Sequence, residues 1–501
     1  MSTAFFALAT LALSALYKLS RIGSRERGLP PGPPTIPVLG NILQIPTSNA
    51  FLRFTEWARE FGEIYSLKVG PSTSIVLSSP AAIREVLDKH SARTSDRPPN
   101  TVADVSSFRM PKSCPGVLTR LLPADRWRQL RKGAQTLLAP SVVKDYLPLQ
   151  EAESTQLLFD ILNTPENFYR QIHRFSASIV TAIIFGKRSP RLETPGAVAI
   201  AEINALWDHF LGPGAIPPVD IFPFLKWIPE RLAPWIKEAR TIRKMQRALY
   251  LDLFDQCQRR VDAGDSSFFM GSVIRDQAVH GLNRVQMSML AGAMYEAGSE
   301  TSAFFLQALV LLLTAYPEVQ AKAHAELDSV VGEGRMPMYA DADNLPYIQA
   351  VVQETHRLKT LVPLALPHRA TADVHYNGYL IPEGATIFGN LYGMYHDPEL
   401  FEDPETFRPE RYLLSEHGTK PRVDDSDFRT TLIFGTGRRI CPGMHLGPVT
   451  AILGAMKLLW AFDFQPEIET KTGKEYPLDL HAFRGVSARQ KSPQALWGNR
   501  R

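Results

Sequence analysis

Most of the chain carries apolar residues spaced three and four apart, in stretches that end at a proline or a glycine. Residues at this spacing share one face of a helix, so each stretch predicts a helix with one buried side. The predicted long helices cover residues 143–162, 166–186, 235–263, 284–315 and 317–331. The helix over 284–315 would be about 48 Å long at 1.5 Å per residue, so it could cross the whole domain.

A few short stretches favour strands instead. Ile64–Val69 and Ser74–Leu77 are β-prone and are separated by Gly70-Pro71-Ser72, which predicts a hairpin. A second pair is expected within Val374–Ile381, where Asn377-Gly378 is a turn signal. Without an internal repeat or a low-complexity block, the pattern predicts a mainly α protein with a small β region.

Two apolar stretches raise the question of a membrane. Residues 304–315, FFLQALVLLLTA, are too short to span a bilayer and contain Gln307, so we expect a buried core helix there. Residues 4–17 carry no charge, and the positive charges Lys18 and Arg21 follow directly. This order favours one N-terminal membrane-anchor helix (1–22), with the rest of the chain on the cytoplasmic side, over a cleaved secretory signal.

A basic and proline-rich linker (23–41) comes next. Residues 29–41 read LPPGPPTIPVLGN, and five prolines in such a run predict a stiff, extended spacer. The remaining residues, 42–501, are expected to form one domain.

Composition narrows the class of protein. The 501 residues include 55 basic and 51 acidic ones, giving a net charge of +4, which is too small to indicate a nucleic-acid-binding protein. The three cysteines, Cys114, Cys257 and Cys441, cannot form a disulfide framework in a chain of this size. Reduced thiols in a cytosolic redox environment are therefore predicted.

The strongest chemical signal is FGTGRRICPG at residues 434–443. A metal-binding thiolate needs nearby positive charge, which Arg438 and Arg439 can supply. Glycines allow the backbone to approach a flat macrocycle, and the apolar run after Gly443 predicts a helix whose N-terminus points toward Cys441. Cys114 and Cys257 have no such setting and are interpreted as small buried hydrophobic residues.

This segment resembles the cysteine-ligand loop of the cytochrome P450 superfamily, whose pattern is F-[G/S]-x-G-x-R-x-C-x-G. The resemblance implies that Cys441 is the proximal ligand of a haem iron. It also implies that Arg439 contacts a haem propionate and that Phe434 packs beside the sulfur. Pro448 departs from the expected pattern, because a proline in the first turns of the following helix could kink it.

Further motifs occur in the order that the family requires. AGSETS at residues 297–302 resembles the oxygen-activation pattern, in which small residues Ala297 and Gly298 let the helix lie close above a haem. Glu300 and Thr301 supply the carboxyl and hydroxyl groups of a proton relay. Because of the resemblance, both are candidate catalytic residues.

The segment ETHR at residues 354–357, followed by FRPERY at 407–412, resembles a second family element. An isolated Glu and Arg three residues apart are usually a weak surface ion pair. The resemblance instead implies a buried triad of Glu354, Arg357 and Arg411 that serves folding and haem retention.

Trp127 and Arg131 lie four residues apart on a predicted helix and resemble the family's W-x-x-x-R, whose two donors bind a haem propionate. His368 falls where related microsomal members place another propionate donor. The alternative interpretation is that His368 is an ordinary loop histidine.

The resemblance implies a cytochrome P450 fold and a haem-thiolate monooxygenase with haem b. The reaction inserts one oxygen atom from O2 into a substrate, and the electrons come from NADPH through NADPH–cytochrome P450 reductase. The expected location is the endoplasmic reticulum membrane, with the catalytic domain on its cytoplasmic face. A haem-thiolate isomerase and a non-catalytic haem-binding protein are the alternatives.

Apolar residues predict a lipophilic small-molecule substrate; they are Met294, Ala297, Leu361–Leu366 and Phe483. The chain is similar to fungal microsomal members of secondary-metabolite biosynthesis, while sterol or xenobiotic oxidation is the alternative.

Overall fold

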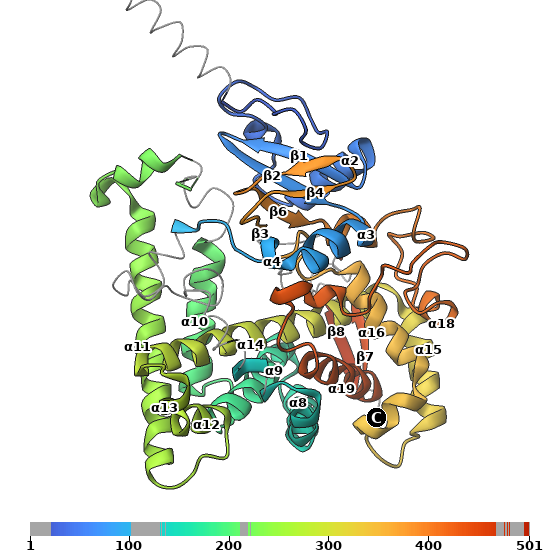
Figure 1. Cartoon of the computed structure of the whole chain (residues 1–501). Helices are drawn as coiled ribbons and strands as arrows, with labels where there is room; N and C mark the ends of the chain where they lie inside the picture. Colours follow the sequence, from blue (N-terminus) through green and yellow to red (C-terminus); the bar gives the residue numbers. More distant parts are fainter. Residues whose placement is uncertain are drawn as a thin grey trace, which may run out of the picture.

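The computed structural model describes residues 22–101, 131, 133–135, 137–210, 219–220, 222–466, 475, 478, 480 and 495–499. Four features predicted from the sequence lie outside this part: the anchor up to residue 21, Cys114, Trp127 and Phe483. The described part is mainly helical with small sheets, as the apolar pattern predicts (Figure 1).

The longer helices are α2 (Ala50–Phe61), α8 (Leu147–Asn163), α9 (Phe168–Phe185), α10 (Pro195–Phe210), α11 (Pro234–Asp262), α14 (Arg284–Ala315), α15 (Pro317–Val330), α16 (Pro346–Leu358) and α19 (Leu446–Ala461). The shorter ones are α3 (Pro80–Ile83), α4 (Ser91–Thr94), α7 (Pro140–Val143), α12 (Phe269–Arg275), α13 (Gln277–His280), α17 (Leu391–Tyr395) and α18 (Arg411–Leu414). The five predicted long helices correspond to α8, α9, α11, α14 and α15, with ends close to the expected ones.

The main sheet has the strand order β1-β2-β6-β3, formed by β1 (Ile64–Val69), β2 (Ser72–Leu77), β6 (Thr386–Gly389) and β3 (His368–Arg369). β1 and β2 are the predicted hairpin, and β2 pairs in parallel with β6 from the far end of the chain. The second predicted hairpin is β4 (Val374–Tyr376) with β5 (Tyr379–Ile381). β7 (Phe462–Pro466) pairs with β8 (Ala495–Asn499). In Figure 1 the main sheet lies near the top with α2 beside it, above α14, α9, α8 and α19.

α14 passes through the middle of the helical region. Asn283 and Gln286 form a capping box at its start, where each side chain accepts a hydrogen bond from the other residue's backbone N–H. In the described part, α14 is the one helix long and apolar enough to cross a membrane, but 72% of its most apolar window is buried inside the protein. The prediction of a core helix is therefore confirmed.

The proline-rich segment is not a free spacer. The guanidinium of Arg25 donates to the carbonyl oxygens of Gly32 and Pro33 and to Ser66 on β1. The Ser66 hydroxyl and backbone N–H in turn donate to the carbonyls of Pro30 (2.6 Å) and Pro31 (2.7 Å). These hydrogen bonds hold the segment along the sheet, whereas the sequence predicts only its extended shape.

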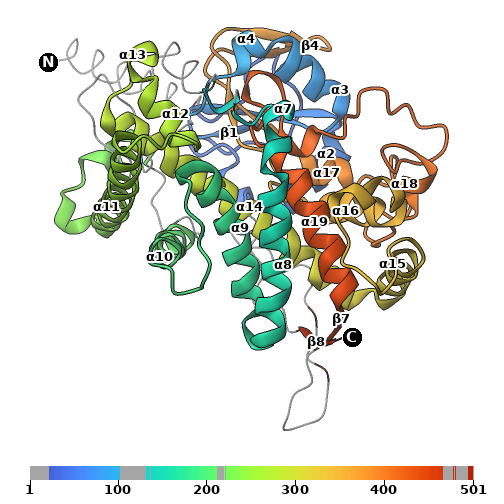
Figure 2. The same ribbon diagram turned by 90° about the horizontal axis from the view of Figure 1, so that it is seen from below.

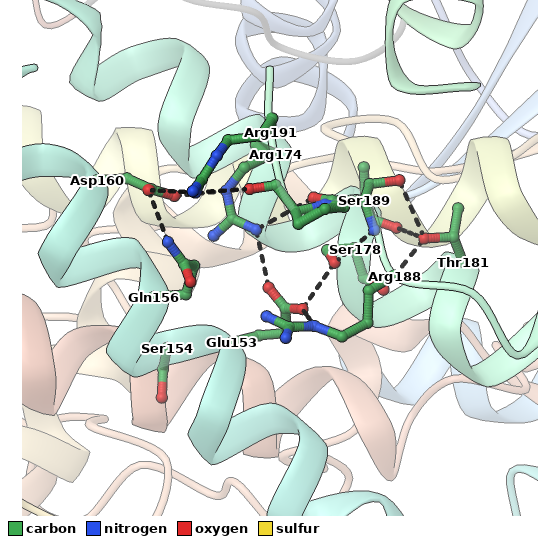
Figure 3. A network of polar contacts seen from close by, with 12 residues as sticks. Glu153, Ser154, Gln156, Asp160, Arg174, Ser178, Thr181, Arg188, Ser189 and Arg191 are labelled. Carbon is green, nitrogen blue, oxygen red and sulfur yellow. Dashed lines mark hydrogen bonds and ion pairs between the residues drawn. The ribbon is translucent and has the colours of Figure 1, made fainter. Parts of the chain in front are cut away.

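α8 lies beside α19, as Figure 2 shows, and a buried hydrogen bond joins Gln150 to Thr450 (2.8 Å). On its other side α8 meets α9 through the polar network of Figure 3. Glu153 is its centre, and it accepts hydrogen bonds from Arg174 (2.8 Å), Ser178 (2.8 Å) and Arg188. Since Glu153 and Arg174 are both buried, this ionic contact fixes α8 and α9 against each other below α14.

Candidate functional site

The backbone of the cysteine loop (residues 434–443) is held against the segment Arg84–Lys89. Gly437 has a φ of +60°, and a Cβ there would lie 2.3 Å from the carbonyl oxygen of Leu87, so no other residue fits without movement. The carboxylate of Asp88 accepts hydrogen bonds from the Gly437 N–H (2.6 Å) and the Thr436 hydroxyl. This explains the glycine that the loop pattern requires.

The thiol of Cys441 lies at the end of this loop. Its backbone N–H donates to the carbonyl of Phe434 (2.7 Å), which folds the loop back on itself. Burial raises the pKa of the thiol, while a hydrogen bond from the Gly443 backbone and the charge of Arg131 act to lower it. Burial outweighs them and raises the pKa of the thiol, and a cation bound at the sulfur would favour its ionised form.

The helix that follows the loop contains Pro448 in its first turn. α19 starts at Leu446, which makes Pro448 its third residue. The first N–H groups of a helix have no partner within it, so a proline there removes no helical hydrogen bond. Pro448 is therefore compatible with this helix, and α19 continues from Leu446 to Ala461 as one element.

On α14, Ala297 and Thr301 lie one turn apart and are exposed, whereas Ser299 and Ala303 between and after them are buried. Cys441 is half-buried although its environment is desolvated. We infer that the accessible surfaces of α14 and of Cys441 border one enclosed space, and we take that space as the candidate site.

Three arginines, here called the arginine cluster, lie beside the cysteine loop: Arg97 and Arg131 are buried, and Arg439 is half-buried. Their guanidinium groups donate to backbone carbonyls: Arg97 to Leu366 (2.6 Å) and Pro367 (2.7 Å), Arg439 to Ser95 (2.7 Å), and Arg131 to Ile440. Burial and the nearby charge of Arg439 lower the pKa of Arg97 to about 10.

The cluster has more donors than acceptors. The Nε atoms of Arg97 and Arg131 are buried and have no hydrogen-bond partner in the described part of the chain. Asp96 offsets the positive charge only in part, and it is also paired with Arg369 (3.5 Å). Leaving buried cationic donors unpaired is costly, so this site fits an anionic group with several oxygens, such as the carboxylates of a haem.

His368 on β3 lies beside the cluster, close to Arg97 and Arg439. Its Nδ1 lies 2.7 Å from the carbonyl oxygen of Thr94, and a carbonyl only accepts, so Nδ1 carries the proton. Burial, Arg97 and Arg439 lower the pKa of His368 to about 3. The ring is therefore neutral with a bare Nε2, and it can donate to an anion only after gaining a second proton.

Thr301 and Glu300 point in different directions from α14. The Thr301 hydroxyl donates to the carbonyl of Ala297 (2.9 Å) at the enclosed space. The Glu300 carboxylate accepts from Asn204 on α10 and lies 3.7 Å from Nδ1 of His173 on α9. The two candidate catalytic groups are neighbours in sequence, yet Glu300 is held on the side of α9 and α10.

Gly298 makes a contact that the sequence does not predict. A Cβ at this position would lie 2.9 Å from Cγ2 of Val180 on α9, and the Gly298 carbonyl accepts a hydrogen bond from Ser176 (3.2 Å). The glycine therefore lets α14 pack closely on α9.

The triad of Glu354, Arg357 and Arg411 is present and buried. Arg357 contacts both Glu354 oxygens (2.7 and 2.8 Å), and Nε of Arg411 donates to one of them (3.1 Å). Arg357 also donates to the carbonyls of Tyr395 (2.6 Å) and Pro404 (2.8 Å). These bonds tie α16 to the segment before the cysteine loop, as the sequence predicts.

The structure thus brings together Arg131, His368, Phe434, Arg439 and Cys441, while Trp127 lies outside the described residues. Arg97 is the site residue that the sequence analysis missed. Its only local signal is the two prolines that follow it, and its burial depends on contacts with Leu366 and Pro367, about 270 residues away.

Comparison with known proteins agrees with this arrangement. The cytochrome P450 family profile matches residues 30–491. The chain is 40% identical to a cytochrome P450 monooxygenase of Armillaria gallica over 479 residues, which cover 95% of this chain and 90% of that protein. It is 38% identical to cytochrome P450 monooxygenase macC of Penicillium terrestre (97% and 91%) and 38% identical to one of Arthrobotrys oligospora (91% and 85%).

Proposed function

Because the chain belongs to the cytochrome P450 family and is a monooxygenase, we propose that Cys441 is the residue that binds its haem iron. The family implies a haem held by a cysteine thiolate. The observation that carries the assignment is the proximity of the Cys441 sulfur to an arginine cluster in which the buried Nε atoms of Arg97 and Arg131 lack acceptors among the described residues.

In this proposal the arginine cluster and Trp127 hold the two haem carboxylates. His368 completes that contact when an adjacent carboxylate raises its pKa, since an anion stabilises the imidazolium form. Phe434 packs at the base of the loop. The haem, when bound, supplies the reductive activation of O2 and the transfer of one oxygen atom to the substrate.

Thr301 holds a proton-carrying hydroxyl at the enclosed space, and Glu300 supplies protons to it. The Thr301 hydroxyl donates a hydrogen bond to the Ala297 carbonyl, so its oxygen can accept a proton from another direction. It can pass a proton on by rotating away from that carbonyl. Glu300 must leave Asn204 to approach it. Release of this contact is the movement that the relay requires.

The substrate is proposed to be a lipophilic small molecule of secondary metabolism. Apolar side chains support this: Leu361 packs on Phe304 and Ala308 of α14, next to Thr301, and Met294 lies half-buried two turns earlier. The electrons are proposed to come from NADPH through NADPH–cytochrome P450 reductase. We place the enzyme in the endoplasmic reticulum membrane, anchored by residues 1–22, with the catalytic domain on the cytoplasmic face.

Replacing Thr301 by alanine tests the monooxygenase mechanism. The substrate is the first compound of a lipophilic panel that the wild type oxidises in the presence of reductase and NADPH. With this substrate, Thr301→Ala should still consume NADPH but should release hydrogen peroxide in place of oxidised product. We expect product per NADPH to fall at least about tenfold, because positioned proton-transfer groups contribute about 10²–10⁴-fold. Product is measured by mass spectrometry and peroxide by a coupled assay.

Thr314→Ala is the matched control. Thr314 lies on the same helix and makes the same hydrogen bond to the carbonyl four residues earlier (2.8 Å), but it is buried away from the site. Its coupling should equal that of the wild type. If Thr301→Ala coupled as well as Thr314→Ala, the proposed relay through Thr301 would be refuted.

A further inference from the structure

His356 on α16 lies in an aromatic column that links the oxygen-side helix to the cysteine loop. Its imidazole stacks on Phe305 of α14, with ring centroids 4.3 Å apart and planes inclined by 29°. On its other side it meets the Phe434 ring edge-on, at 6.4 Å and 62°. We call these three side chains the aromatic column (Phe305, His356 and Phe434).

The ion-pair triad does not account for this residue. Its neighbours Glu354 and Arg357 point into the triad, whereas no hydrogen bond to His356 is found among the described residues. Burial lowers its pKa to about 4, so the ring is neutral at physiological pH. His356 is therefore a neutral side chain that packs through its ring against an aromatic ring on each side.

The Phe434 end of the column is directly connected to the metal ligand. The carbonyl of Phe434 accepts the backbone N–H of Cys441 (2.7 Å), so any shift of Phe434 moves the backbone of the sulfur-bearing residue. The other anchor of the loop, Asp88, acts on Thr436 and Gly437 rather than on Phe434. The position of the Phe434 ring therefore depends on what packs against it.

We propose that His356 is a positioning residue for the cysteine loop: through its ring contacts with Phe305 and Phe434 it fixes Phe434 and thereby the backbone of Cys441. This inference rests on the proposed role of Cys441 as the iron ligand. The contact needed is a flat ring, because the geometry observed is a stack on one side and an edge contact on the other.

Three variants separate ring packing from other effects. His356→Phe keeps a flat ring of similar reach, His356→Leu removes the ring, and His356→Gln keeps a polar side chain without a ring. The readout is the fraction of reduced, carbon-monoxide-treated protein that shows the red-shifted absorption of thiolate ligation. This fraction is compared only among variants that far-UV circular dichroism shows to be folded.

His396→Leu is the matched control. His396 is also buried and also stacked, on Tyr392 with centroids 3.8 Å apart and planes inclined by 15°. Burial lowers its pKa to about 3, so it too is neutral, and among the described residues its ring contact is with Tyr392 and not with the column. Because its Nδ1 also hydrogen-bonds to the Tyr392 carbonyl (3.0 Å), His396→Leu removes a buried ring and a hydrogen bond, a larger loss than that in His356→Leu, at a site outside the column.

We expect the thiolate-ligated fraction to fall at least twofold in His356→Leu and His356→Gln, and to remain at the wild-type level in His356→Phe and His396→Leu. The proposal is overturned if His356→Leu behaves like His396→Leu, or if Gln rescues the signal and Phe does not. A wild-type protein without the red-shifted band would instead refute Cys441 as the ligand.

Discussion

At the scale of single residues, the burial of charge explains most of the site. Arg97, Arg131 and Arg439 repel one another in the interior, and the buried Nε atoms of Arg97 and Arg131, which have no acceptor in the described part of the chain, favour an anionic partner there. The same reasoning applies to a buried acid that the proposed reaction does not use. Glu296 on α14 accepts hydrogen bonds from Gln246 (2.6 Å) and Tyr250 of α11.

Glu296→Gln should stabilise the protein in a pH-dependent way. Burial, with a smaller effect of Glu300, raises the pKa of Glu296 above its ordinary value of 4.5 despite the hydrogen bonds from Tyr250 and Gln246. A raised pKa means that the folded state binds the proton more tightly, so the wild type loses stability as pH rises above 4.5. Glutamine keeps the acceptor oxygen and has no charge to bury.

The difference in free energy of unfolding between Glu296→Gln and wild type should therefore be small near pH 4 and grow in favour of the variant toward pH 8. Urea denaturation at several pH values measures it. A difference that stays constant over this range would mean that Glu296 is not desolvated in the folded protein.

Motifs within one stretch of sequence could be predicted at this scale, but contacts across the chain could not. The ten residues of the cysteine loop carry their own glycine and arginine pattern, and Thr301 and Ala297 share a helix face by spacing alone. In contrast, Gly298 and Arg97 depend on Val180 and on Leu366, and no periodicity reports such partners. The tautomer of His368 likewise depends on Thr94, which lies 274 residues away.

At the scale of elements, ion pairs between helices hold the frame around the site. The network between α8 and α9 in Figure 3 is buried at its centre and open at its edge. Burial alone would raise the pKa of Glu153, but hydrogen bonds from Arg188, Arg174 and Ser178 outweigh it and lower the pKa. The Glu153 carboxylate is therefore ionised, and its negative charge compensates the positive charges of Arg174 and Arg188.

Glu153→Gln should lower the free energy of unfolding by about 3–5 kcal/mol, because it leaves the buried Arg174 without one of its two acidic partners. Arg191→Gln is the control at the edge of the same network. Its side chain is 66% exposed and lies 3.9 Å from Asp160, so its loss should cost at most about 1 kcal/mol. Equal effects of the two substitutions in urea denaturation would contradict the account.

Helices and hairpins follow well from the sequence, since the apolar spacing and the Asn377-Gly378 turn are local. Their partners do not. The parallel pairing of β2 with β6 joins segments more than 300 residues apart, and the docking of residues 30–33 on β1 depends on Arg25 and Ser66. A pattern of prolines gives the shape of that segment but not the surface that receives it.

At the scale of the whole molecule, we predict that the site and the proposed membrane anchor are separable. The docked part of the chain includes the backbone hydrogen bond from Val38 to Ile22 (2.6 Å) and those of Arg25, after the apolar N-terminal stretch. Several exposed apolar side chains lie on or just after this docked part, and we predict that they face the same membrane as the anchor; they are Ile36, Val38, Leu43 and Leu52. Folding of the haem domain should thus need residue 22 onward only.

Deletion of residues 2–21 should leave the protein folded and its absorption spectrum unchanged, but release it from membranes. Sedimentation with phospholipid vesicles measures the binding, and the full-length protein should resist a high-salt wash because apolar insertion is not screened by ions. The anchor prediction would be wrong if the shortened protein sedimented as completely as the full-length one.

The absorption spectrum of the reduced, carbon-monoxide-treated protein tests the central claim most directly. The wild type should show the red-shifted band of a thiolate-ligated haem, and Cys441→Ala should abolish it. Cys257→Ala should retain it, since burial raises the pKa of Cys257 to about 12 and keeps it an inert thiol. Absence of the band in the wild type, or its persistence in Cys441→Ala, would contradict the account.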